Sequence, residues 1–359
     1  MPSRVPSANV AIQTQAARRE RRRRRRLFWL VGTLSALAFC VLGFVGMAVL
    51  SFLTPWGRQL RLLLAETVIS TRHSRWAHWL VTPHEYAQLW KQINAPVFNT
   101  GLSGMVRPGG WSGRGPVIEV HFVRGSTYNG YVMLVHDPRL IRLVEAHVHG
   151  SEGEYITDMA RRVGAVAGTN ASGFEDPNGN GWGGIPVGLE YVDGVLVHPA
   201  KNDPAWTTVG FTSSGLLVMG HYTVPALQAM GVRDAMQFRP ELVVNGKPMI
   251  TVGDGGWGLG PRTAIGQARD GTVIFIVLNG RFHGGAGMGA SQRQVMDLML
   301  QYGAVNACAM DGGSSSVLYY HGKIINAPST IDPHGERHLP DAWLVFPTEA
   351  AANAYHAGM

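Results

Sequence analysis

Cysteine is scarce in this sequence, and the two copies exclude a fold held together by disulfides. Among 359 residues only Cys40 and Cys308 are cysteines, and they lie far apart in the chain. Small disulfide scaffolds need several paired cysteines, so a large hydrophobic core must stabilise this protein instead. Cys308 lies in an apolar, strand-like run with no neighbouring base, which favours a small core residue over a nucleophile.

Charged residues are also sparse, at 15% of the chain, and the positive excess is local. The net charge is +7, yet eight arginines lie between residues 18 and 26, offset there only by Glu20. The rest of the chain is therefore close to neutral. This distribution excludes a nucleic-acid-binding surface and describes a basic tail.

The one long apolar run follows that tail directly. Leu27 to Leu53 is 27 residues without a charge, and a helix of that length crosses the roughly 30 Å hydrocarbon core of a bilayer. We expect residues 1–26 to be a cytoplasmic tail, residues 27–53 a single-pass signal anchor, and all that follows to lie outside the cell membrane. A cleaved signal peptide is the alternative, and the arginines faintly resemble a twin-arginine export signal.

The remaining chain predicts an α+β fold with a mixed, mostly antiparallel β-sheet and few helices. Residues 54–95 have helical apolar spacing and are expected to form a membrane-proximal stalk. Residues 96–347 alternate short β-rich runs with glycine turns, and residues 348–359 are expected to be a C-terminal tail. "YVDGVLV" and "VVNGKPMI" predict hairpins with Asp-Gly and Asn-Gly turns. Helices are predicted within 152–164 and 291–303.

Four polar, glycine-rich segments each follow or precede an apolar run, where rigid strands can hold functional groups. The first, 166–184, places Asn170 at the end of a strand, with Glu175 and Asp176 shortly after. Read alone, this segment favours an Asx turn in a surface loop.

The same segment contains half of a calcium-loop pattern. Asp176, Asn178 and Asn180 are followed by Gly181, as in the first half of such a loop. Val187 stands where the bidentate glutamate is expected. The sequence therefore leaves a calcium site open as an alternative to a plain glycine-rich turn and demands no cofactor.

Two further segments carry arginines. Arg262 follows Pro261 and precedes a strand, which would fix its planar guanidinium for bidentate binding of a phosphate or carboxylate. The segment 277–294 contains Asn279 and Arg281 and then enters a helix near Ser291. The start of that helix is either an anion site or an ordinary N-cap.

The last segment, "NACAMDGGSSSVLYYHGK", places the lone carboxylate of Asp311 after a buried strand. Gly312 and Gly313 would let a substrate approach the backbone, and Ser314 begins a run of three hydroxyl donors. A structural aspartate that caps a turn is the competing interpretation.

Three of these motifs, in this order, resemble the phosphodiester glycosidase family: "NASGF" from Asn170, "RTAIG" from Arg262 and "MDGGSSSV" from Met310. The resemblance covers about residues 117–347. The family often has glycine at the position of Ser314, a glycine pair at 171 and 172, and aspartate at the position of Asn279. These departures bear on substrate choice.

The resemblance implies hydrolysis of a sugar-1-phosphodiester, which releases a sugar and a phosphomonoester, in cell-surface glycans such as teichoic acid or exopolysaccharide. It implies Arg262, with Arg281, on the phosphate and Asp311 at the anomeric carbon as base or nucleophile. Asn170 would position substrate or water, and Glu175 is the spare carboxylate. The implied substrate-binding residues are completed by Thr263, Asn279, Gly312, Gly313 and Ser314. Two alternatives stay open: a non-catalytic glycan-binding or assembly protein, and a phosphodiesterase that cuts the other P–O bond. The sequence identifies no protein partner.

Overall fold

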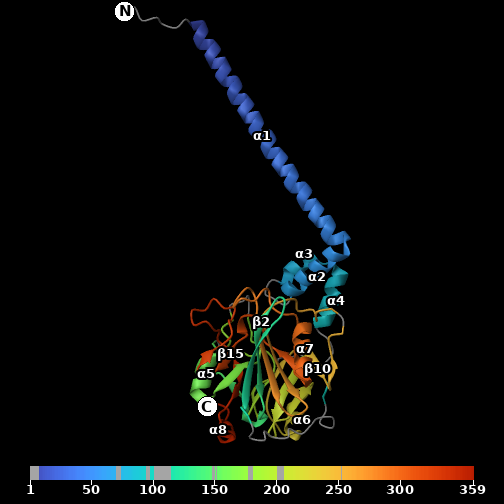
Figure 1. Cartoon of the computed structure of the whole chain (residues 1–359), viewed down its shortest axis with the longest axis vertical. Coiled ribbons are helices and arrows are strands. Elements are labelled where there is room, and N and C mark those ends of the chain that lie inside the picture. Colours follow the sequence, from blue (N-terminus) through green and yellow to red (C-terminus); the bar gives the residue numbers. More distant parts are fainter. Residues whose placement is uncertain are drawn as a thin grey trace, which may run out of the picture. The chain divides into compact units, whose positions relative to one another are not determined.

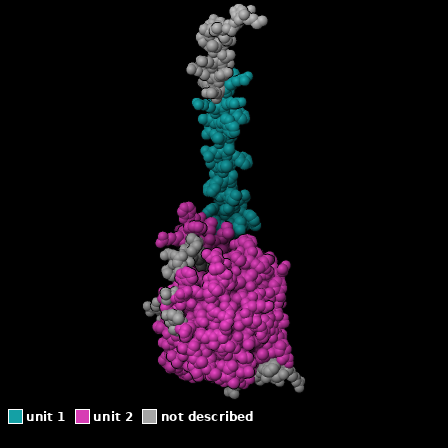
Figure 2. Space-filling model, turned by 90° about the vertical axis from the view of Figure 1, so that its left-hand side faces the viewer, with its two compact units in different colours: residues 1–62 teal, residues 63–359 magenta. Residues whose placement is uncertain are grey.

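The computed structural model describes residues 8–69, 74–93, 98–100, 115–147, 150, 152–176, 181–199, 206–251 and 253–359. The chain divides into two compact units, residues 1–62 and 63–359, which Figure 2 colours separately.

The N-terminal unit contains one long helix, α1 (Ala8–Leu53). Its segment Arg24–Leu53 has 30 residues and contains an 18-residue window with a mean hydropathy of 2.5, none of which is buried. By length and composition this segment can cross a membrane, and a signal sequence has the same properties. The helix ends before Pro55, where α2 (Pro55–Ile69) begins with the Thr54 hydroxyl accepting a hydrogen bond from the Gly57 amide. Proline at the first position of a helix ends the preceding one because it lacks an N–H group.

The second unit is built on three β-sheets (Figure 1). Sheet 1 has the strand order β1 (Ile118–Arg124), β2 (Asn129–Val135), β13 (Val273–Asn279), β12 (Arg262–Ala268), β14 (Ala304–Met310), β10 (Glu241–Val244) and β11 (Lys247–Pro248). Sheet 2 has the order β16 (Lys323–Ile324), β15 (Leu318–Tyr320), β4 (Ala167–Asn170), β17 (Asp341–Val345) and β3 (Ile141–Glu145). Sheet 3 has the order β6 (Val195–His198), β5 (Glu190–Val192), β9 (Val232–Phe238), β7 (Thr207–Thr212) and β8 (Leu217–Gly220). The predicted α+β class with mostly antiparallel sheets is confirmed, since these strand pairs are antiparallel.

The helices of this unit are short; two precede the first strand, three lie between strands and one follows the last strand. They are α3 (Ala77–Leu80), α4 (Pro83–Ile93), α5 (Ile156–Val163), α6 (Val224–Ala229), α7 (Gln292–Gln301) and α8 (Glu349–Asn353). Single 3-10 turns lie at Ser74–Trp76, Pro138–Leu140 and Gly313–Ser315. The expected N-cap of α7 is confirmed, because Ser291 forms a full capping box with Gln294.

Both predicted hairpin turns are present. Asp193 and Gly194 have φ values of +52° and +78° between β5 and β6, and Asn245 and Gly246 have +50° and +76° between β10 and β11. Positive φ at both central positions defines the type I′ turn, which Asp-Gly and Asn-Gly adopt at little steric cost.

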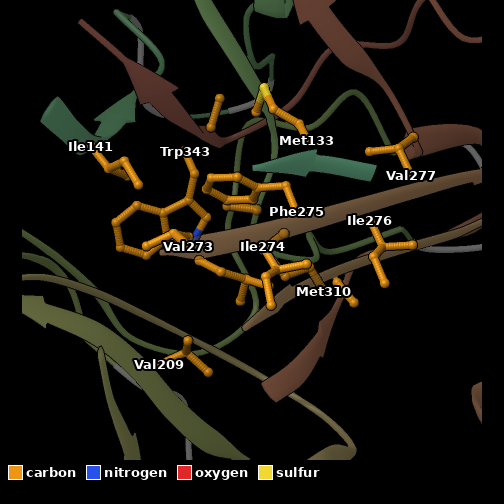
Figure 3. Packing of buried hydrophobic residues seen from close by; sticks show 14 of the residues in the cluster. Met133, Ile141, Val209, Val273, Ile274, Phe275, Ile276, Val277, Met310 and Trp343 are labelled. Carbon is orange, nitrogen blue, oxygen red and sulfur yellow. The ribbon is translucent and has the colours of Figure 1, made fainter. Parts of the chain in front are cut away.

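The three sheets meet around Trp343 of β17, whose side chain is fully buried. Its ring lies edge-on to Phe211 of sheet 3 at 5.4 Å between centroids, and Figure 3 shows it beside Phe275 of sheet 1. Cys308 of β14 belongs to the same buried cluster, which confirms it as a core residue. Ala352 and Tyr355, near the C-terminal end of the sequence, belong to this buried cluster as well. Arg142 of β3 donates hydrogen bonds to the carbonyl oxygens of both residues.

Candidate active site

Strand register brings the predicted polar residues to one edge of sheet 1. Thr263 of β12 pairs with Met310 of β14, so Arg262 and Asp311 emerge side by side at the strand ends. Arg262 pairs on its other side with Leu278 of β13, which places Asn279 at the same edge. Antiparallel pairing thus gathers groups that are up to 49 positions apart in the sequence.

The chain crosses from sheet 1 to sheet 2 at Asp311, because β14 belongs to sheet 1 and β15 to sheet 2. Backbone hydrogen bonds hold this crossover on two sides. The Asp311 amide donates to the Ala171 carbonyl at 3.1 Å, and the Gly313 amide donates to the Pro261 carbonyl at 2.9 Å. The three motif segments therefore contact one another through their main chains.

Asn170 joins these segments with its side chain. It is fully buried at the end of β4. Its Nδ2 donates to the Asp311 carbonyl at 2.7 Å, and its Oδ1 accepts from the Thr263 hydroxyl at 3.0 Å and from the Val317 amide at 3.2 Å. This geometry makes Asn170 and Thr263 positioning residues for the Asp311 loop.

The Asp311 carboxyl is partly buried at the start of this loop. Burial raises its pKa from 3.8 to about 6, against the opposing effects of a Ser315 hydrogen bond and of the Arg337 charge. A carboxyl group with a pKa near the working pH can accept a proton or attack as a nucleophile in neutral solution.

Arg262 is a buried cation without a carboxylate partner among the described residues. Its Nε donates to the Ala290 carbonyl at 2.9 Å, and its Nη2 donates to the carbonyls of Trp257 and Gly258, each at 2.7 Å. Burial lowers its pKa to about 10, with a further contribution from the Arg281 charge. The guanidinium stays protonated at neutral pH, and a buried unpaired cation favours an anionic ligand.

Two glycines keep space open between the Asp311 loop and the arginines. A Cβ on Gly312 would lie 2.9 Å from the Pro261 carbonyl oxygen and 3.8 Å from Arg262 Nη1. A Cβ on Gly313, whose φ is +63°, would lie 3.1 Å from Arg281 Nη2. Both guanidinium groups therefore face backbone that has no side chain, as close approach of a ligand requires.

Arg337 is a third arginine at this site, and the sequence analysis missed it. Its Nη1 donates to the Ser314 hydroxyl at 2.9 Å, and its Nη2 donates to the Gly181 carbonyl at 3.0 Å. Its guanidinium also lies 4.4 Å from the centroid of the Phe174 ring. Arg337 precedes β17 in a loop without a recognisable motif, so only its position before a strand could have indicated it.

The other predicted residues lie around this centre. Asn279 is buried and donates to the Asn129 side chain at 2.8 Å, while its Oδ1 accepts from the Ala327 amide at 2.9 Å. It therefore holds the loops that flank Arg281. Glu175 is exposed, and its amide donates to the Ile185 carbonyl at 2.8 Å.

The Asp176 carboxylate is bonded to other groups of the protein. Its Oδ1 accepts from the Gly181 amide at 2.6 Å, and its Oδ2 lies 3.4 Å from Arg337 Nη2. Asn178 and Asn180 of the calcium-loop pattern lie outside the described residues. Among residues that are described, no group of three or more His, Cys, Asp or Glu side chains could hold a metal ion.

The start of α7 does not provide an anion site. The Gln294 amide donates to the Ser291 hydroxyl, the Arg293 amide to the Asp254 carbonyl and the Val295 amide to the Ser291 carbonyl. These donors are used within the protein, so the N-cap interpretation of this segment holds and the anion interpretation does not.

Two buried acidic residues, Asp341 and Glu190, lie next to the "NASGF" motif. The Asp341 carboxylate accepts from the Ser172 amide at 2.7 Å and from the Ser172 hydroxyl at 2.6 Å. Glu190 of β5 adjoins it and is fully buried. Burial raises the pKa of both carboxyl groups, and the Asp341 charge raises that of Glu190 further. The pair keeps the loop after Asn170 in place.

The site therefore combines one titratable carboxyl group, that of Asp311, with several guanidinium groups. These groups surround the backbone of Gly312 and Gly313. Arg262 and Arg281 have no carboxylate ion pair among the described residues, whereas Arg337 shares its charge with Asp176. Such an arrangement can bind an anion and present a carboxylate to an adjacent carbon atom.

Comparison with known proteins places the chain near one family. The profile of the phosphodiester glycosidase family matches residues 163–346. The SPbeta prophage-derived protein YomE of Bacillus subtilis is 35% identical over 185 residues, which are 48% of this chain and 27% of YomE. The chain therefore spans little more than a quarter of that relative's length.

The fold is also similar to a solved structure. The zebrafish N-acetylglucosamine-1-phosphodiester alpha-N-acetylglucosaminidase catalytic domain, auto-inhibited by its pro-peptide, superimposes with a TM-score of 0.55 at 18% identity. The match covers 71% of this chain and 89% of that domain. At this identity the likeness concerns the fold alone.

Proposed function

Since the chain belongs to the phosphodiester glycosidase family, we propose that it hydrolyses the bond between a sugar's anomeric carbon and the oxygen of a phosphodiester. The observation that carries this proposal is the glycine backbone that follows Asp311: Arg262 and Arg281 face Gly312 and Gly313, and neither arginine forms an ion pair with a carboxylate among the described residues. A phosphodiester has one negative charge and a neighbouring electrophilic carbon, and this site offers a matching group for each.

In the proposed reaction, Arg262 and Arg281 hold the diester anion across Gly312 and Gly313. The C1–O bond breaks, and its electron pair stays on the phosphate oxygen. A phosphomonoester has a second pKa of about 6, so it leaves readily without a strong general acid. Asp311 either removes a proton from the attacking water or attacks C1 itself and is then released by water.

Asn170 acts through the loop that it holds, since its side-chain atoms already bond to Asp311, Thr263 and Val317. Ser314 is held by Arg337 and would orient the substrate's phosphate side. Glu175, which is exposed, would serve only if the reaction needs a second carboxyl group.

We further propose that residues 27–53 anchor the enzyme and that residues 1–26 stay in the cytoplasm, because eight arginines directly precede the apolar segment and only Arg58 and Arg61 closely follow it. The substrates would then be phosphodiester-linked glycans outside the cell, such as teichoic acid or exopolysaccharide. Protease accessibility of residues 63–359 from the outer face of intact cells tests this orientation.

Product analysis tests the chemistry. Detergent-solubilised full-length protein is incubated with UDP-N-acetylglucosamine and with purified teichoic acid, beside Asp311→Asn. Free reducing sugar, accompanied by UDP from the first substrate and by a phosphomonoester from the second, formed by wild type only, is the expected result. Sugar-1-phosphate would show instead that the enzyme cleaves the P–O bond on the side of the phosphorus atom away from the sugar. Glycan binding without turnover, equal in both proteins, would favour a binding protein.

A further inference from the structure

One tryptophan beside the proposed site has a fixed backbone and an exposed ring. Trp182 is 58% exposed, although the segment around it is tightly packed. Its carbonyl accepts from the Gly153 amide at 2.7 Å. A Cβ on Gly183, whose φ is +73°, would lie 2.3 Å from the His338 carbonyl oxygen. The chain therefore holds the backbone of Trp182 in one place while leaving much of its side chain in contact with water.

Aromatic rings support the indole from one side. The His338 imidazole lies 5.6 Å from the Trp182 ring, and the Tyr155 ring lies 4.0 Å from His338. The Tyr155 hydroxyl donates to Asp332 at 3.0 Å, which fixes the end of this row. Stacked and tilted aromatic pairs of this kind restrict ring motion, so the exposed part of the indole is preorganised for a ligand.

The row of Trp182, His338 and Tyr155 is connected to the Asp311 loop through Arg337. The carbonyl of Gly181, the residue before Trp182, accepts from Arg337 Nη2 at 3.0 Å, and Arg337 Nη1 donates to Ser314 at 2.9 Å. Ser314 lies three residues after Asp311. Trp182 thus lies one residue beyond a direct hydrogen-bonded connection to the Asp311 loop.

We propose that Trp182, backed by His338, is a stacking platform for a sugar ring next to the cleaved unit of a phosphodiester-linked chain. The face of a pyranose ring carries C–H groups and its rim carries hydroxyls. A large exposed aromatic ring beside cationic groups matches that mixture. This inference rests on the proposed function and adds that the enzyme prefers oligomeric glycans to single sugar-1-phosphodiesters.

Two substrates separate the platform from the reaction centre. One is the methyl phosphodiester of N-acetylglucosamine 1-phosphate, and the other is a phosphodiester-linked oligomer of N-acetylglucosamine. In Trp182→Ala, we expect kcat/KM on the oligomer to fall about tenfold, because a stacked sugar covers roughly 60 Å² of apolar indole surface. The value on the methyl diester should stay within about twofold of wild type, and Trp182→Phe should recover most of the loss on the oligomer.

Trp79→Ala is the matched control, because Trp79 is 84% exposed and belongs to α3, a helix that contributes no residue to the row of Trp182, His338 and Tyr155. Both substrates should be cleaved by this variant as by wild type. An equal loss on both substrates in Trp182→Ala would indicate a structural role and overturn the platform, as would no loss on either.

If wild type cleaves neither substrate, the proposed function fails while the platform can still be judged by binding. Calorimetric titration with the oligomer then compares wild type with Trp182→Ala in the full-length protein. Weaker binding by the variant supports the platform. Equal binding, or no binding by wild type, overturns it.

Discussion

Replacing Asp311 with asparagine should abolish turnover and at the same time stabilise the folded protein at neutral pH. Asparagine has the same shape as aspartate and keeps an oxygen to accept the Ser315 hydrogen bond. It cannot ionise, so it can act neither as base nor as nucleophile. We expect kcat/KM to fall by at least about a thousandfold.

The gain in stability follows from the raised pKa. Burial lifts the Asp311 pKa from 3.8 to about 6 in the folded protein. The folded state therefore holds this proton more tightly than the unfolded chain, and wild-type stability falls as pH rises from about 4 to about 6. The pKa difference corresponds to about 3 kcal/mol. Since the residue is partly exposed, screening by water reduces this, and we expect about 1–2 kcal/mol.

Two measurements check this reasoning on the detergent-solubilised chain. Urea unfolding at pH 7.5 should show Asp311→Asn to be more stable than wild type, and the difference should disappear at pH 4, where wild type is already protonated. The kcat/KM of wild type should rise with pH through about 6, the Asp311 pKa. An asparagine variant that is less stable at pH 7.5, or that turns over normally, would refute the argument.

Four further predictions concern the surrounding residues. Arg262→Lys should lower kcat/KM about a hundredfold or more and also destabilise the fold, because lysine cannot reach three carbonyl groups in one plane; enzyme assays and thermal unfolding measure the two effects. Asn170→Ala should cost about 3 kcal/mol in urea unfolding, since three buried polar groups lose their partner. Glu175→Gln should keep kcat/KM within about fivefold, because a phosphate leaving group needs little protonation, and a hundredfold loss would make Glu175 the general acid. Excess EDTA should leave kcat/KM unchanged, because the Asp176 carboxylate already accepts from Gly181 and lies against an arginine; loss of activity restored by calcium would contradict this.

Local chemistry in the sequence determined much of the fold. The Asp193-Gly194 and Asn245-Gly246 turns depend on two adjacent residues that tolerate positive φ. The start of α7 depends on Ser291 and Gln294, three positions apart. Such signals act over a few residues, so they can be recognised in a single chain.

The sequence also indicated the polar residues at strand ends, but their relationships came from the tertiary structure. Arg262 and Asp311 become neighbours only through the β12–β14 register. Asn170 was expected to position substrate or water, and the structure adds that its side chain bonds to the Asp311 carbonyl, the Thr263 hydroxyl and the Val317 amide. Which atoms a buried amide bonds to depends on loops from three parts of the chain, and no local pattern encodes that.

Arg337 and Trp182 illustrate the remaining limit. Neither belongs to a motif, since each is an ordinary residue in a glycine-containing loop. Arg337 reaches the site because it precedes β17, which pairs with the strand that ends at Asn170. The sequence by itself determined the anchor-like apolar segment, the strands, the turns and the motif residues, because hydropathy and turn preference are local properties. Only the tertiary structure decided which charges meet and which ring stays exposed, because those depend on long-range packing of the three sheets.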